Sequence, residues 1–279
     1  MTTLDHIIDV TRERVAHARR QESASLLPQL AGNHVPRGFR RRLVAMSQAS
    51  PAVIAELKKA SPSKGVIRPD FPVGQLAGQL AKSGASALSV LTDERFFQGS
   101  LNNLVEASAA TDIPCLRKDF IVDEFQIVEA RAHRADAILL ILAALDETLF
   151  QHLLGRARET GLDVVCEVHN EAELARAIEG GADMIGVNSR DLKTFEVRTE
   201  TLWDLAPAIP GRVLRIAESG ITQGAEIRDF YNAGYQAFLI GETLMRAEEP
   251  GKKLQSLLEE AGFYPQAAGA PSAWRRKVH

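Results

Sequence analysis

Charged or polar residues stand at the ends of five short apolar runs in this sequence of 279 residues. They are Glu56 with Lys58, Lys118, Glu167, Asn188, and Glu218 with Ser219. A charged side chain in buried apolar surroundings is costly unless it is paired or functional. One or two of these residues could be structural ion pairs, but five such positions meeting at one place would supply acids and bases for proton transfer. We therefore expect the group to form a reactive centre.

A repeating pattern indicates which elements would bring these residues together. From Pro51 onward, a helical stretch, small residues and a short apolar run follow one another, as in 84–90, 181–187 and 234–240. Eight such runs predict buried strands near 52–57, 86–92, 114–118, 136–141, 163–168, 183–188, 213–217 and 236–240. Helical stretches between them include 73–82, 101–110, 123–133, 146–160, 171–179, 199–205 and 223–233. Residues typical of helix starts precede four of these: Asp123, Asp146, Asn170 and Thr222.

Regular alternation of strands and helices predicts a parallel sheet, and eight units are the number that closes into a barrel. The main alternative is an open doubly wound sheet, which commonly carries a GxGxxG fingerprint after its first strand. Here the first strand is followed by Lys58-Lys-Ala-Ser-Pro-Ser-Lys-Gly65, which does not match it. The sequence therefore predicts an α/β protein with a (β/α)₈ TIM barrel, whose reaction takes place at the C-terminal strand ends.

The barrel pattern leaves a segment at each end of the chain. Amphipathic patterns predict helices near 5–20 and 38–46, so residues 1–50 form an N-terminal helical extension. The barrel then covers 51–262 in a chain that forms one domain, and 263–279 form a C-terminal tail. From about residue 267 onward the tail is expected to be frayed, with its basic end exposed to solvent.

Composition narrows the partners and the compartment. The formal net charge of -3 gives no reason to expect nucleic acid or an anionic membrane as partner. The sequence contains no apolar run near the roughly 20 residues that span a bilayer. Cys115 and Cys166 lie in apolar runs without metal-ligand or disulfide spacing, which predicts buried reduced thiols and no metal site. We expect a cytoplasmic protein.

A second pattern indicates a phosphate site. Glu218-Ser-Gly-Ile221 follows the seventh strand, and Gly241-Glu-Thr-Leu244 follows the eighth. Small residues there expose backbone N–H groups, and a short helix after Gly241 would direct its positive end inward. Barrels often bind phosphate at these two loops. We therefore expect Ser219, Gly220, Gly241 and Glu242 to bind the phosphate of a small-molecule substrate.

Several segments resemble one known family. Val53-Ile-Ala-Glu-Leu-Lys-Lys-Ala-Ser-Pro-Ser-Lys-Gly65 resembles the opening signature of indole-3-glycerol-phosphate synthases. Segments 89–100, 116–121, 185–192 and 217–221 resemble the same family, and the match runs from about 52 to 245 in the family's order. Gly241-Glu242 departs from the Gly-Ser of some members, but a backbone contact would survive this difference.

The resemblance implies a reaction and a pathway. The substrate would be 1-(2-carboxyphenylamino)-1-deoxyribulose 5-phosphate, and the enzyme would be a carboxy-lyase that closes the indole ring and releases carbon dioxide and water. It also implies tryptophan biosynthesis and no cofactor. Other tryptophan-pathway enzymes are candidate protein partners.

The resemblance also assigns roles. Lys118 would be the general acid and Glu167 its partner, relaying protons in the dehydration. Lys58 would hold the substrate carboxylate, and it is a candidate second acid. Glu56 would hold both lysines and orient the ring nitrogen.

The remaining assignments concern substrate recognition. They are Asn188 and Arg190 for the carboxylate and hydroxyl groups, Ser61 and Ser219 for the phosphate, and Phe97 and Phe120 for an apolar wall around the anthranilate ring. Ordinary packing remains the alternative for each aromatic residue.

Two other functions remain to be separated from this one. A phosphoribosylanthranilate isomerase binds a similar ligand but commonly uses a cysteine and an aspartate rather than paired lysines. Cys115 precedes Lys118 by an odd spacing, so its side chain should face the opposite side of the strand. A catalytically silent barrel would have lost its acid–base residues, whereas every expected type is present here.

Overall fold

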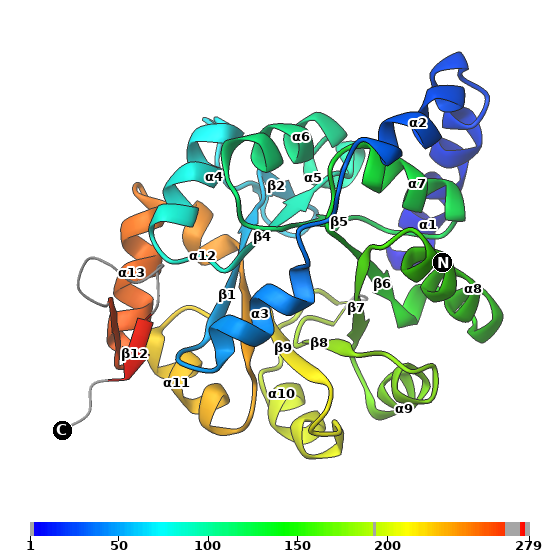
Figure 1. Ribbon diagram of the computed structural model, residues 1–279. Coiled ribbons are helices and arrows are strands. Elements are labelled where there is room, and N and C mark those ends of the chain that lie inside the picture. The colour runs from blue at the N-terminus through cyan, green and yellow to red at the C-terminus, as the bar shows by residue number, and fades with distance from the viewer. Residues whose placement is uncertain (1–2, 192–193, 266–273, 277–279) are drawn as a thin grey trace.

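Eight parallel strands close into a barrel within residues 3–191, 194–265 and 274–276, the part of the chain that the computed structural model describes (Figure 1). The ring closes because the first strand pairs with both the second and the last. The barrel strands are β1 (Ala52–Leu57), β4 (Ala87–Leu91), β5 (Cys115–Lys118), β6 (Ala137–Ile141), β7 (Asp163–Val168), β8 (Met184–Asn188), β9 (Leu214–Glu218) and β10 (Ala237–Ile240). The predicted TIM barrel is confirmed.

Helices form an outer ring around the barrel (Figure 1). They are α4 (Val73–Lys82), α6 (Leu101–Ala110), α7 (Glu124–Ala132), α8 (Glu147–Glu159), α9 (Glu171–Glu179), α10 (Glu200–Leu205), α11 (Gly224–Asn232) and α13 (Pro250–Glu260). The side chains of Asp123, Asp146 and Asn170 cap α7, α8 and α9, as predicted. The predicted helix start at Thr222 was wrong by one residue. Gln223 caps α11 in a capping box with Glu226, and Glu226 also accepts the backbone N–H of Thr222.

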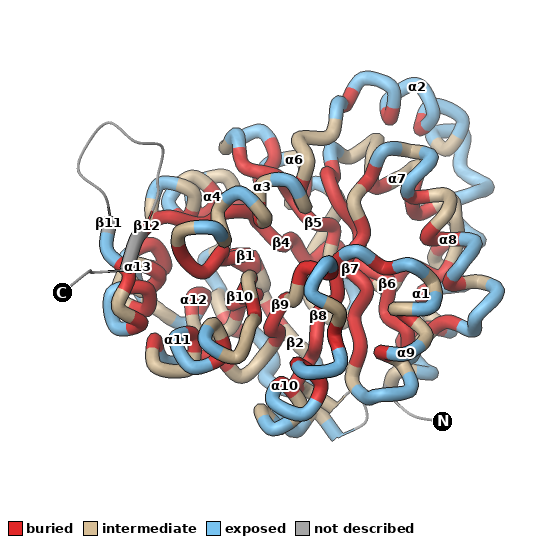
Figure 2. Tube along the Cα trace, turned by 60° about the horizontal axis from the view of Figure 1, so that its bottom comes forward, coloured by how far each residue is buried: buried red, intermediate tan, exposed pale blue. Residues whose placement is uncertain are grey.

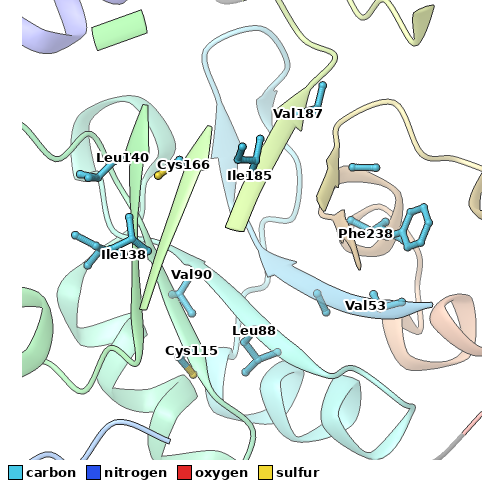
Figure 3. Packing of buried hydrophobic residues seen from close by; sticks show 14 of the residues in the cluster. Val53, Leu88, Val90, Cys115, Ile138, Leu140, Cys166, Ile185, Val187 and Phe238 are labelled. Carbon is cyan, nitrogen blue, oxygen red and sulfur yellow. The ribbon is translucent and has the colours of Figure 1, made fainter. Parts of the chain in front are cut away.

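Two apolar layers hold the barrel together, because successive residues of a strand point to opposite faces. The inner layer includes Ile54, Leu116 and Met184. The outer layer lies between strands and helices and includes Val53, Leu88, Val90, Cys115, Ile138, Leu140, Cys166, Ile185, Val187 and Phe238 (Figure 3). The strands are buried along their length, whereas exposed residues lie on the outer helices and loops (Figure 2).

Both cysteines are free and buried in the outer layer. Cys115 therefore faces away from the barrel interior, as its spacing from Lys118 predicted. Burial raises the pKa of each thiol to about 12, so both remain protonated at neutral pH. In the described residues, the helices are too short or too polar to cross a bilayer. The cytoplasmic location stays a prediction.

The N-terminal extension contacts both ends of the barrel. It contains α1 (Thr3–Ala18), the short 3-10 helix η1 (Glu22–Leu26), α2 (Leu27–Gly32) and α3 (Phe39–Ser47). The helices predicted near 5–20 and 38–46 are α1 and α3, whereas α2 was not predicted. Phe39 and Leu43 of α3 are fully buried against the inner layer, and α3 covers the N-terminal end of the barrel (Figure 1).

Small elements lie in the connecting segments. An antiparallel pair, β2 (Ala60–Ser61) and β3 (Gly65–Val66), follows β1. Two short helices, α5 (Glu94–Phe97) and α12 (Glu242–Met245), follow β4 and β10. The 3-10 helices η2 (Leu142–Ala144) and η3 (Ala206–Ala208) follow β6 and α10.

The prediction of a frayed tail was wrong for three residues. β12 (Trp274–Arg276) pairs with β11 (Phe263–Pro265) in an antiparallel ribbon. Trp274 is only 4% exposed, because its ring lies over Gly84. A β-carbon at Gly84 would lie 2.2 Å from the indole nitrogen, and its φ of +105° also favours glycine. The rest of the predicted frayed segment, 267–273 and 277–279, lies outside the described residues.

Candidate active site

A cavity of about 650 Å³ opens at the C-terminal ends of the barrel strands, a volume typical of small-molecule sites. All of the residues proposed from sequence line it. They are Glu56, Lys58, Ser61, Phe97, Lys118, Phe120, Glu167, Asn188, Arg190, Ser219, Gly220, Gly241 and Glu242. The barrel thus brings the whole set together from loops and strands throughout the chain. Their chemical roles stay predictions.

Lys118, the last residue of β5, lies between two carboxylates. Its Nζ is 3.1 Å from Oε2 of Glu167 and 3.6 Å from Oε2 of Glu218. Burial by itself would lower the pKa of Lys118, but Glu167, Glu218 and Glu56 outweigh it and raise that pKa above its usual range. Lys118 is therefore a mostly buried ammonium group at neutral pH, with 15% of its side chain exposed, and groups that can exchange protons with it surround it.

Glu167 and Glu218 have opposite pKa shifts although they share Lys118. Burial would raise the pKa of Glu167, but Lys118, His169 and Asn188 outweigh it and hold that pKa well below its usual range. For Glu218, burial raises the pKa to about 8; Lys118 opposes this rise, and the charge of Glu167 adds to it. Two neighbouring carboxyl groups with separated pKa values provide one base and one acid at neutral pH.

Glu218 is the residue whose importance the sequence did not reveal. Its position at a strand end was recognised, but no role was assigned to it. In the structure it is 1% exposed, and its Oε1 makes no hydrogen bond within the described residues. A protonated carboxyl with an unused oxygen beside the cavity can donate to a substrate oxygen.

Glu56 and Lys58 form a second pair at the end of β1. Nζ of Lys58 is 2.6 Å from Oε1 of Glu56, and both side chains point the same way because they are two residues apart. The expectation that Glu56 also holds Lys118 is not met at contact distance, because Glu167 and Glu218 take that place. Glu56 acts on Lys118 only as a nearby charge.

The loops after β9 and β10, for which the sequence predicts phosphate binding, line one end of the cavity. Ser219 and Gly220 both have left-handed backbone, with φ of +68° and +77°, and the Ser219 hydroxyl donates to Oδ1 of Asn188. Gly241 has a φ of -119°, which other residues also adopt, so backbone conformation does not explain why glycine stands at this position. A β-carbon there would lie 2.2 Å from Oε1 of Glu56. Gly241 thus makes room for Glu56, in addition to any role toward a phosphate.

Charges around this end have both signs. Lys64, Arg190 and Arg246 line the cavity and would attract an anion. Glu242 accepts a hydrogen bond from Nε of Arg246 at 2.9 Å, and its Oε2 lies 3.9 Å from Nη2 of Arg190. Burial would raise the pKa of Glu242, but Arg246, Lys58 and Lys64 lower it, so Glu242 is a carboxylate engaged with cations.

Phe97 and Phe120, which were predicted to enclose an aromatic ring, both line the cavity. The rings of Phe97 and Phe120 lie 6.3 Å apart between centroids and are inclined by 38°. Leu4 and Ile7 of α1 line the same cavity, which sequence reasoning missed. Periodicity predicts that a helix has an apolar face, but not which cavity that face will cover.

A partly buried ion-pair network fixes α1 beside Lys118. Arg14 of α1 donates to both oxygens of Asp119, at 3.0 and 3.1 Å. Asp119 also accepts from Thr92 and from Arg117, whose side chain is fully buried. Asp119 directly follows Lys118, so this network joins the N-terminal extension to the strand end that carries Lys118. These contacts also went unpredicted, because Arg14 and Asp119 are 105 residues apart.

His169, which the sequence reasoning passed over, does not line the cavity but contacts one of the residues that do. It stands two residues after Glu167, and its Nε2 lies 3.4 Å from Oε1 of that carboxylate. The spacing of two residues, which places side chains on one face of an extended chain, was the available signal. In the described part of the chain, His, Cys, Asp and Glu side chains form no group of three or more arranged to hold a metal ion.

Comparisons with known proteins agree with the geometry. A family model described as indole-3-glycerol phosphate synthase matches residues 4–257. A protein of that name from Koribacter versatilis (strain Ellin345) is 52% identical over 257 residues, covering 92% of this chain and 99% of the relative. Another from Burkholderia vietnamiensis (strain G4 / LMG 22486) is 48% identical over 252 residues, covering 90% and 97%.

The chain is also similar to solved barrel structures. A 3-hexulose-6-phosphate synthase from Salmonella typhimurium superposes with a TM-score of 0.60 at 15% sequence identity, covering 75% of this chain and 98% of that one. At this level of identity the likeness concerns the fold alone.

Proposed function

The chain belongs to the indole-3-glycerol phosphate synthase family, and from this premise we propose that its cavity converts 1-(2-carboxyphenylamino)-1-deoxyribulose 5-phosphate into indole-3-glycerol phosphate. The reaction closes a ring and releases carbon dioxide and water, which would make the enzyme a carboxy-lyase of tryptophan biosynthesis. One observation carries the proposal: a buried ammonium group, Lys118, lies between the two carboxyl groups of Glu167 and Glu218. Ring closure and dehydration require such positioned acids and bases.

In the first step, the aromatic carbon that bears the carboxylate attacks the ketone carbon of the sugar chain. The carbonyl electron pair moves to oxygen, which takes a proton from Lys118. The raised pKa of Lys118 ensures that this proton is present at neutral pH. The ionised Glu167 stabilises the ammonium group before transfer and compensates for its burial, while the protonated Glu218 lies on the other side of Nζ.

In the second step, the carboxylate leaves as carbon dioxide and its bonding electrons restore the aromatic ring. Lys58 holds that carboxylate before it leaves, and Glu56 holds Lys58 through their 2.6 Å ion pair. The apolar wall of Phe97 and Phe120 encloses the ring and excludes water from it.

In the third step, the new hydroxyl leaves as water while a proton is removed to form the indole double bond. Glu167 accepts that proton, since its low pKa keeps it ionised. The leaving hydroxyl takes a proton from an acid at the cavity wall. Glu218, protonated below about pH 8, can supply it, and Lys58 is a second candidate.

The phosphate of the substrate is proposed to bind at the loops after β9 and β10, assisted by the hydroxyl of Ser61 from the segment after β1, the strand that pairs with β10. Backbone N–H groups near Gly220 and Gly241 would donate to it, and Lys64, Arg190 and Arg246 add positive charge. Asn188 and Arg190 would position the hydroxyl and carboxylate groups. Other tryptophan-pathway enzymes remain proposed partners.

The test is to supply the purified protein with each of two substrates and follow ultraviolet absorbance. Indole absorbance should appear with the carboxyphenylamino deoxyribulose phosphate. Phosphoribosylanthranilate should not be isomerised, because Cys115 is buried outside the barrel interior and cannot reach the cavity. Isomerisation without indole formation would overturn the proposal. No reaction with either substrate would favour a binding protein without catalytic activity.

A further inference from the structure

Three ionisable side chains form a chain that leads from Lys118 toward the outside of the barrel. Nε2 of His169 lies 3.4 Å from Oε1 of Glu167, and Nδ1 lies 3.1 Å from Oε2 of Glu173. Glu173, in the first turn of α9, also accepts the backbone N–H of His169 at 2.8 Å. Its other oxygen accepts from the side chain of Asn170, the residue that caps α9. The imidazole is therefore hydrogen-bonded to Glu173 through Nδ1, and its Nε2, which has no hydrogen-bond partner among the described residues, lies within ion-pair distance of Glu167.

The two oxygens of Glu167 have different partners. Oε2 accepts a hydrogen bond from Lys118, whereas Oε1 faces His169. The side chains of His169 and Glu173 are 12% and 14% exposed, and that of Glu167 is 1% exposed. Little water is available to replace the imidazole as a partner of Glu167.

Charges on both sides of the ring support its ionised form. Burial would lower the pKa of His169, but Glu167 and Glu173 outweigh it and raise that pKa to about 10. Both carboxylates have lowered pKa values, so the sequence of charges across neutral pH is carboxylate, imidazolium, carboxylate. On the far side of Glu167 the facing groups are Lys118 and Glu218.

We propose that His169 is a positioning residue: the imidazolium holds Oε1 of Glu167 so that Oε2 faces Lys118 and the substrate, and Glu173 fixes the orientation of the ring. The inference rests on the proposed function, since it concerns the base of the dehydration step. A carboxylate held at one oxygen keeps the other in a single geometry, and misplacement of a reacting group by about 1 Å can lower a rate by roughly 100-fold.

The role predicts effects that simple loss of stability would not produce. His169→Ala removes a cation that favours ionised Glu167, so the pKa of Glu167 rises and the acid limb of the kcat profile moves to higher pH. Because the substrate does not touch His169 in this account, kcat should fall by roughly 10- to 100-fold while KM stays near its wild-type value. His169→Gln, which keeps a donor but no charge, should recover part of kcat while the acid limb remains shifted.

The experiment compares His169→Ala, His169→Gln and Glu173→Gln with His152→Ala, as steady-state kcat and KM against pH, with thermal unfolding of each variant. His152 also pairs with a glutamate, Glu124 at 3.2 Å, but lies on α8 with half its side chain exposed. That control should behave as wild type. If His169→Ala does not fold, His169→Gln and Glu173→Gln test the same role, with a smaller expected fall in kcat and a shift of the acid limb in the same direction.

Two results would overturn the role. One is folded His169 variants with wild-type kcat and an unshifted acid limb; the other is a raised KM with unchanged kcat. The proposed function would still be supported in either case if the wild type is active and Glu167→Gln inactivates it. A wild type that forms no indole chromophore would overturn the proposed function itself, and the positioning role with it.

Discussion

A β-carbon at Gly186 would lie 2.0 Å from Oε1 of Glu218, so the carboxyl group occupies space that only glycine leaves open on β8. Gly241 has the same relationship to Glu56, at 2.2 Å. Neither glycine has left-handed backbone. These glycines are therefore required for space, and each makes room for one carboxyl group of the cavity.

Gly186→Ala should displace Glu218 and lower kcat by roughly tenfold or more, because the reacting groups lose their alignment. The matched control is Gly155→Ala on α8, where an added β-carbon meets nothing within 4 Å. That change should leave activity unaltered and stabilise the fold by about 0.5–1 kcal/mol. Kinetics and thermal unfolding of the two variants would check this, and wild-type kcat in Gly186→Ala would contradict it.

Glu167→Gln should lower kcat strongly with little change in KM. The amide has nearly the shape of the carboxylate, so the substrate should still bind, but the amide cannot accept the proton of the dehydration step. Steady-state kinetics separate the two parameters. Ordinary kcat with a greatly raised KM would assign Glu167 to binding instead.

The raised pKa of Glu218 predicts an alkaline limit. Because Glu218 holds its proton until about pH 8, kcat should fall as the pH rises through that value and the acid of the dehydration step is lost. Glu218→Gln should be slower at every pH and should lack this limb. A limb that persists unchanged in the Gln variant belongs to another group.

If the loops after β9 and β10 bind the phosphate, two substitutions in these loops should change KM to different extents. Gly241→Val should raise KM and also lower kcat, since the new side chain would crowd Glu56. Ser219→Ala should change KM less, because its backbone donor remains. Inorganic phosphate should compete with substrate in the wild type. If phosphate does not compete and Gly241→Val has wild-type kcat and KM, the substrate phosphate binds at another place.

The parts of the molecule that follow local rules could be predicted from the sequence. Alternation along a strand placed Lys118 toward the cavity and Cys115 outside the barrel, and short polar side chains marked three helix starts. The contact of Arg14 with Asp119 depends on packing between distant segments, which no periodicity encodes. Likewise, a strand glycine such as Gly186 cannot be connected with Glu218 until the neighbouring strands are in register.

Lys118 is proposed to protonate the ketone during ring closure. Lys118→Met should reduce indole absorbance by about 10²–10⁴-fold in rate when purified variant and substrate are mixed, the usual cost of losing one positioned acid. Lys82→Met, a change of the same kind at an exposed position at the end of α4, should leave the rate unchanged. Circular dichroism would establish that both variants are folded. A folded Lys118→Met that forms indole at a near-normal kcat would show that Lys118 is not this acid.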